Sequence, residues 1–128
     1  MTEARLPVAL LAACVGGVIG SLARAGLTTW LPVGQGFPWT AFAINVVGSA
    51  LLAALPAVAA VRRTPWLAVF LGTGVLGGFT TMSAASAQTV TLLEHDHVLT
   101  GVLYAGGTLL AALLAVVVVT HRMPEEPA

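Results

Sequence analysis

Long apolar runs, joined by short polar segments, make up most of the chain. A helix needs about 20 mostly apolar residues to cross a membrane, and four runs are long enough: 6–27, 39–61, 66–93 and 98–120. The connections between them, 31–38, 62–65 and 94–97, hold turn-forming and charged residues. We therefore predict an all-α membrane protein, with a single four-helix transmembrane domain over residues 1–128 and no soluble domain.

The composition agrees with a lipid environment. Hydrophobic residues make up 58% of the chain and charged residues only 8%, whereas a soluble domain carries about 25% charged residues. The formal net charge is zero, so nothing in the composition indicates a nucleic acid as partner. Three tryptophans lie at the ends of the apolar runs, where indole rings anchor helices at the headgroups: Trp30, Trp39 and Trp66.

The charged residues of the connections predict an orientation. With four spans, the two termini and the middle connection share one side of the membrane, and that side holds Arg5, Arg62, Arg63 and Arg122. The other side has no Lys or Arg in its connections, but it has Glu94 and Asp96. Because basic loops stay in the cytoplasm, we expect both termini there.

The third run is too long for a straight helix across the membrane. Its 28 residues would span about 42 Å as a helix, against a hydrocarbon core about 30 Å thick. Four glycines precede two threonines within it, and this pattern predicts a mid-membrane break at 77–82. Broken helices in transport proteins offer free carbonyls to cations. The alternative is that Gly74 and Gly78 only permit close helix packing, as a GxxxG pair does.

The other helices carry a few polar side chains at membrane depth. Arg24 follows the small residues of the first run, and it either extends to the outer interface or gives an aqueous vestibule a positive potential. Asn45 and Ser49 share one face of the second helix. The amide of Asn45 either bonds a neighbouring helix or offers its N–H to an anion. On the fourth helix Tyr104 lies four residues before Thr108, whose hydroxyl can bond its own helix backbone.

No carboxylate lies within the four runs, because all five are in the termini and connections: Glu3, Glu94, Asp96, Glu125 and Glu126. Proton-coupled cation carriers need an intramembrane acid, which argues against a small dual-topology multidrug carrier. No segment combines a nucleophile, a base and an acid, so we do not expect an enzyme.

Together these motifs resemble the Fluc (CrcB) family of small bacterial fluoride channels. The similarity covers nearly the whole chain, and the string around the break is its most specific part. The matching strings are Gly16-Gly17-x-x-Gly20-Ser21-x-x-Arg24, Pro38-Trp39 with Asn45-x-x-Gly48-Ser49, Gly74-x-x-Gly77-Gly78-Phe79-Thr80-Thr81-x-Ser83, and Tyr104 with Thr108.

The resemblance implies passive, selective fluoride export through an antiparallel, dual-topology dimer in the bacterial cytoplasmic (inner) membrane. It also implies a central structural Na⁺ held by the backbone carbonyls of Gly77 and Thr80 of each subunit. Pore and anion contacts would come from five side chains: Arg24, Asn45, Ser83, Tyr104 and Thr108.

The chain departs from the family pattern at several pore positions. The family's two pore phenylalanines are replaced here by Met82 and Ala85, and Ala41, Ala84 and Ala112 replace family hydroxyl residues. Loop charges are also unbalanced, whereas a self-pairing antiparallel dimer needs one sequence to insert both ways. We therefore expect a heterodimer with an oppositely oriented paralogue. The alternative is a non-conducting subunit that only stabilises or regulates its partner.

Overall fold

The computed structural model of the chain describes residues 5–31 and 36–123, and every regular element in these two ranges is helical. Four helical segments are long and apolar enough to cross a membrane: Leu6–Trp30, Trp39–Ala57, Pro65–Glu94 and Val98–Arg122. The prediction of an all-α protein with four candidate membrane spans is therefore confirmed.

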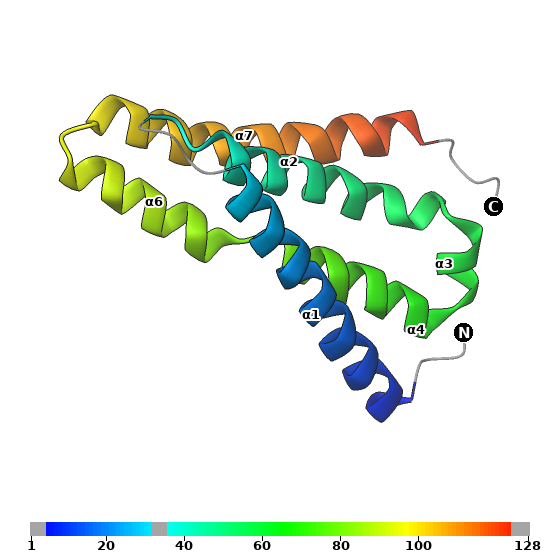
Figure 1. Ribbon diagram of the computed structural model, residues 1–128. Coiled ribbons are helices and arrows are strands. Elements are labelled where there is room, and N and C mark those ends of the chain that lie inside the picture. Colours follow the sequence, from blue (N-terminus) through cyan, green and yellow to red (C-terminus); the bar gives the residue numbers. More distant parts are fainter. Residues whose placement is uncertain (1–4, 32–35, 124–128) are drawn as a thin grey trace.

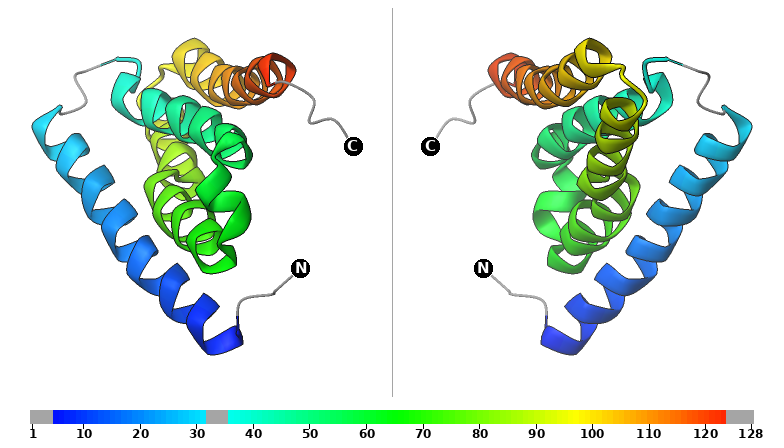
Figure 2. Two further views of the ribbon diagram at one scale, coloured as in Figure 1. Left: turned by 90° about the vertical axis from the view of Figure 1, so that its right-hand side faces the viewer. Right: turned by 90° about the vertical axis from the view of Figure 1, so that its left-hand side faces the viewer.

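The spans form two groups that diverge from the middle of the molecule (Figure 1). In one group α2 (Trp39–Ala54) and α6 (Met82–Glu94) both pack against α7 (Val98–Arg122). In the other, α1 (Leu6–Trp30) packs along the first half of the third span. The views in Figure 2 show α1 set apart from α7. The third span, which contributes to both groups, is thus the element that joins them.

The second span ends earlier than the expected range 39–61. After α2 the chain makes a 3-10 turn, η1 (Leu55–Ala57), and Val58 is extended before the short helix α3 (Ala59–Arg63). Pro56 accounts for this end, because proline has no backbone N–H and cannot continue an α-helix from within. The Arg62 guanidinium donates to the carbonyl of Pro56 at 2.9 Å, which caps the turn.

The third span consists of four helical pieces. It begins with α4 (Pro65–Ala68), continues as the π-helical segment η2 (Val69–Leu76) and the single turn α5 (Gly77–Phe79), and resumes as α6. Only Thr80 and Thr81 between α5 and α6 have extended backbone, with φ/ψ of −77°/152° and −152°/117°. The non-helical backbone is thus narrower than the range 77–82, and the glycines before it remain helical.

Those glycines make the contact with α1. An added Cβ at Gly16 or Gly20 would meet the backbone of η2, and one at Gly78 would lie 2.5 Å from the carbonyl oxygen of Gly17. A Cβ added at Gly74 would lie 2.9 Å from the Cα of Gly16. The two interpretations of the glycine-rich string therefore both apply, since glycines permit close packing and the two threonines interrupt the helix.

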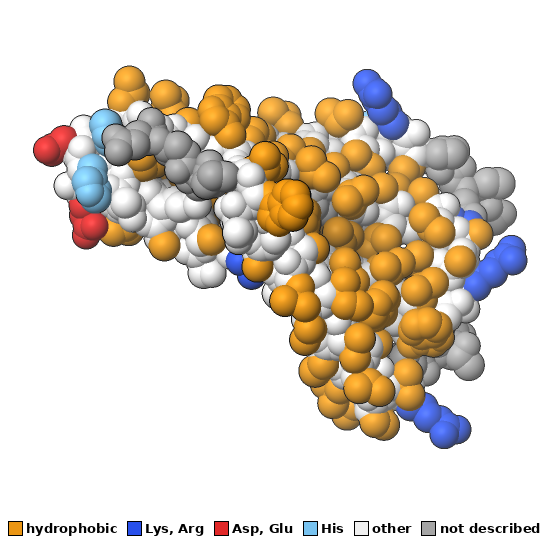
Figure 3. Space-filling model, in the orientation of Figure 1, with side chains coloured by type: hydrophobic (Ala, Val, Ile, Leu, Met, Phe, Trp, Pro, Cys, Tyr) orange, Lys and Arg blue, Asp and Glu red, His pale blue; other side chains and the backbone are white. Residues whose placement is uncertain are grey.

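The outer surface of the spans is mostly apolar, as Figure 3 shows. Between 11% and 22% of an apolar 18-residue window of each span is buried within the described chain, so most residues of each window keep some exposed surface. Basic side chains gather at the end where α3 lies, and acidic and histidine side chains gather at the opposite end (Figure 3).

Candidate functional site

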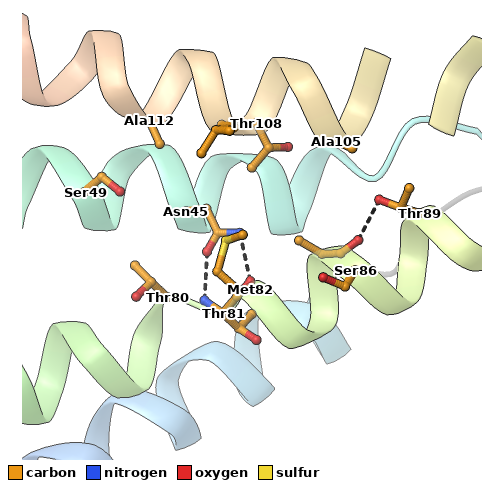
Figure 4. A pocket seen from close by; sticks show the side chains of 12 residues that line it. Asn45, Ser49, Thr80, Thr81, Met82, Ser86, Thr89, Ala105, Thr108 and Ala112 are labelled. Carbon is orange, nitrogen blue, oxygen red and sulfur yellow. Dashed lines mark hydrogen bonds between the residues drawn. The ribbon is translucent and has the colours of Figure 1, made fainter. Parts of the chain in front are cut away.

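A cavity of about 220 Å³ lies between α2, α6 and α7, next to the extended backbone of the third span (Figure 4). Its walls come from all three helices and from both extended threonines. The lining residues are Asn45, Ser49, Thr80, Thr81, Met82, Ala85, Ser86, Thr89, Ala105, Thr108, Leu109 and Ala112.

Helical periodicity explains why these residues face the cavity. On α6 the lining positions are 82, 85, 86 and 89, and on α7 they are 105, 108, 109 and 112. Both sets follow the spacing i, i+3, i+4, i+7, which places side chains on one face of a helix. Each helix therefore presents one continuous stripe to the cavity, and both stripes mix small and hydroxyl-bearing residues.

Asn45 fixes the backbone where the third span is interrupted. Its Nδ2 donates to the carbonyl of Thr81 at 3.0 Å, and the N–H of Thr81 donates to its Oδ1 at 2.8 Å. The side chain is only 6% exposed, so this pairing satisfies an amide that would be costly to bury alone. Asn45 thus bonds a neighbouring helical span, which was one of its two expected uses.

The interruption also leaves the last carbonyls before it without their helical donors. In a continuous helix the N–H of Thr81 would bond the carbonyl of Gly77, and that of Ala84 would bond Thr80. Here the first donates to Asn45, and the second donates to Oγ1 of Thr81 at 3.1 Å, which is the N-cap of α6. The carbonyls of Gly77 and Thr80, the pair expected to bind Na⁺, are therefore among those that lose a helical donor. They suit a hard cation because their oxygens are neutral, polar and at a break in the helix.

Arg24 lies next to the same interruption. Its Nε donates to the carbonyl of Gly78 at 3.2 Å, and the hydroxyl of Ser21 reaches the same oxygen at 3.4 Å. Part of the Arg24 guanidinium is therefore held by the backbone of the third span. Its charge is consequently fixed beside the interruption.

Tyr104 does not line the cavity. Its side chain is fully buried beside Ala41, Ala85 and Leu92. The hydroxyl donates to Oε1 of Gln88 at 2.6 Å. This residue therefore joins α6 to α7.

Thr108 does line the cavity, and its hydroxyl donates to the carbonyl of Tyr104 at 2.6 Å. The single hydroxyl proton is therefore used within its own helix, as is common for helical threonine. Ser83 is exposed and does not line the cavity. Its Oγ and Oγ1 of Thr81 are 3.1 Å apart and share a hydrogen bond.

The two positions at which the chain lacks the family's pore phenylalanines, Met82 and Ala85, differ in their surroundings. Both line the cavity, but Met82 is 70% exposed, whereas Ala85 is 7% exposed and also belongs to the buried core between α6 and α7. A large side chain at Met82 has room, while one at Ala85 would overpack the core of this chain.

Sequence reasoning did not assign the hydroxyl-bearing cavity residues Ser49, Ser86 and Thr89 to the site. The helical spacing of these residues in the sequence could have indicated that they lie on the same faces as the assigned site residues. Ser49 follows Asn45 by four residues, and Ser86 and Thr89 continue the stripe that begins at Met82. The sequence could not indicate which helix would face that stripe.

Comparison with known proteins places the chain in a family. Residues 11–120 match the profile described as CrcB-like protein, Camphor Resistance (CrcB). A fluoride-specific ion channel FluC of Sorangium cellulosum is 42% identical over 79% of the chain and 83% of the relative. Fluoride-specific ion channel FluC 2 of Nocardia farcinica is 40% identical over 89% and 84%, respectively. Fluoride-specific ion channel FluC 1 of Streptomyces coelicolor is 41% identical over 80% and 68%. The chain therefore belongs to the CrcB-like protein family.

Proposed function

We propose that the chain is a subunit of a fluoride-specific ion channel, which lets fluoride leave the cell passively and lowers its cytoplasmic concentration. The observation that carries this proposal is the cavity beside the interrupted third span, which has amide and hydroxyl groups in its walls and no carboxylate. The names of the three relatives support fluoride as the ion.

The electrostatics of the cavity favour an anion. Fluoride is strongly hydrated and needs concentrated hydrogen-bond donors to replace its water. The N-terminus of α6 begins at Met82, so the positive end of its dipole lies at the cavity wall. The described acids, Glu94 and Asp96, lie at the far end of α6, where they do not oppose an anion in the cavity.

A structural Na⁺ at the interruption is part of the proposal. The carbonyls of Gly77 and Thr80 lack their helical donors, and such oxygens are suitable cation ligands. Two carbonyls are too few for one ion, so two more would come from a second subunit. A bound cation there would add positive charge near the anion pathway.

The second subunit would lie antiparallel to the first in the bacterial inner membrane. Basic residues gather at one end of this chain (Figure 3), which favours insertion with both termini in the cytoplasm. We therefore expect the partner to be an oppositely inserted paralogue. The numerals in the names of two relatives fit organisms that encode more than one such chain.

Fluoride efflux from liposomes tests the function. The purified chain, alone and with its paralogue, would be reconstituted in vesicles loaded with fluoride, and release would be followed with a fluoride electrode after valinomycin addition. Release with a paralogue but not alone supports the heterodimer. Efficient release by the chain alone would refute the heterodimer, and no release in either arrangement would refute the channel. Replacing Na⁺ by N-methylglucamine should lower the release if the cation is structural.

A second candidate function is a non-conducting subunit that stabilises its partner. The exposed methionine at position 82 and the buried alanine at position 85 favour it, because neither supplies an aromatic ring to the cavity. A heterodimer in which fluoride release responds to no substitution in this chain's cavity would support this second function.

A further inference from the structure

The hydroxyl groups around the cavity are not equivalent, because several of them already donate their proton to a backbone carbonyl. A hydroxyl has only one proton to donate. Thr80 donates to the carbonyl of Leu76 at 3.0 Å, and Thr89 donates to that of Ala85 at 2.8 Å. Thr108 donates to its own helix as well. These threonines therefore offer an anion a lone pair, which repels it, unless they first break an existing bond.

Two serines in the same walls have no such bond. Within the part of the chain that the structure describes, no hydrogen bond is formed by the hydroxyl of Ser49 or of Ser86. Ser49 is half-buried on α2, and Ser86 is on the cavity stripe of α6. Figure 4 shows Ser49 and Ser86 on opposite sides of Asn45 and Met82 along the cavity.

We propose that Ser49 and Ser86 are the hydroxyl donors that replace water around the anion in this cavity, one on each side of Asn45. This inference rests on the proposed function and names residues that act in it. Asn45 retains one N–H after bonding Thr81, so an anion moving along the row would meet a serine hydroxyl, the amide N–H and a second serine hydroxyl in turn.

Alanine substitution tests the proposal, since S49A and S86A remove the donor and leave the helices intact. Alanine favours the helix more than serine, and Ser49 and Ser86 make no protein hydrogen bond that would be lost. Each substitution should lower fluoride release about tenfold or more, the factor expected for losing one hydrogen bond to a charged group. Release would be measured in the reconstituted assembly that conducts, with the elution profile in detergent as the folding check.

Two further variants control for the loss of a hydroxyl in general. T91V removes a hydroxyl of α6 that bonds the carbonyl of Ala87 at 3.1 Å, outside the cavity, and should leave the release unchanged. T89V removes a cavity hydroxyl whose proton is already used, and should lower the release much less than S86A. The proposal is overturned if S49A and S86A release fluoride at the wild-type rate, or if T89V is as impaired as S86A. Failure of the wild type to release fluoride would instead refute the channel function itself.

Discussion

The side chain of Asn45 and the backbone of Thr81 form a closed pair of hydrogen bonds, 3.0 and 2.8 Å long, between the second and third spans. The pair takes the N–H of Thr81 away from the carbonyl of Gly77, so the same contact that joins the spans also holds the helix open. A buried amide thereby maintains an interruption that would otherwise leave backbone groups unpaired at membrane depth.

Replacing Asn45 by alanine should destabilise the protein by about 2–4 kcal/mol, since two hydrogen bonds are lost and the N–H of Thr81 is left unpaired. Thermal unfolding in detergent, followed by tryptophan fluorescence, would measure the change. Val47, 51% exposed on the same helix, provides the control, and V47A should have almost no effect. Equal unfolding temperatures for N45A and the wild type would contradict the role given to this pair.

The contact between α1 and the third span should be sensitive to one methyl group. A Cβ at Gly20 would overlap the carbonyl of Val75, which is backbone and cannot turn aside. We expect G20A to lose about 1–3 kcal/mol of stability, the usual cost of overpacking, and to elute in detergent as a poorly assembled species. At Gly17 no atom lies within 4 Å of the added Cβ, so G17A should behave as the wild type, and similar losses in both variants would argue against the packing.

Arg24 should contribute through its charge as well as its hydrogen bond to Gly78. R24Q removes the charge, and fluoride release should fall severalfold at low ionic strength, while R24K should retain most of it. At 0.1 M salt, interactions between exposed charges more than about 10 Å apart are largely screened, so the difference between R24Q and the wild type should shrink as salt rises. The exposed Arg63 serves as control, because R63Q removes an equal charge at the end of the molecule. A deficit in R24Q that is independent of salt would indicate a purely structural role.

The hydrogen bond between Tyr104 and Gln88 should stabilise the packing of α6 on α7. Y104F removes only the hydroxyl, leaving Oε1 of Gln88 without its donor at 2.6 Å, and we expect a loss of about 1–2 kcal/mol. The ring contact with Phe37, whose centroid is 5.4 Å away, would remain. Thermal unfolding of Y104F, Q88A and the double variant would test the pair, and fully additive losses would show that the two side chains are not coupled.

A phenylalanine should be tolerated at position 82 and not at position 85, the two positions where the chain lacks the family's pore phenylalanines. M82F places the ring at an exposed site, so the protein should keep its unfolding temperature. A85F should lose about 1–3 kcal/mol, because it forces a ring into the buried contact between α6 and α7. Thermal unfolding of both variants checks this, and a stable A85F would show that the core beside Tyr104 can expand.

Much of the architecture follows from local pattern. Apolar runs of sufficient length predicted the four spans, and the glycines followed by two threonines predicted where the third span would change. Pro56 shortened the second span in a way that the apolar pattern does not register, since proline is itself compatible with an apolar run. Spacing also placed Thr108 with its hydroxyl on its own helix, because the acceptor lies four residues away.

The sequence by itself thus determined the helical class, the number of spans and the face on which each polar residue lies, all of which depend on neighbours within a turn or two. Only the tertiary structure decided which groups meet. The bonds of Asn45 to Thr81 and of Arg24 to Gly78 join residues 36 and 54 positions apart, a distance over which periodicity carries no information. It likewise decided that Tyr104 is buried in the core while Ser49 and Ser86 face the cavity, because the packing of α6 and α2 against α7 selects which side chains face one another.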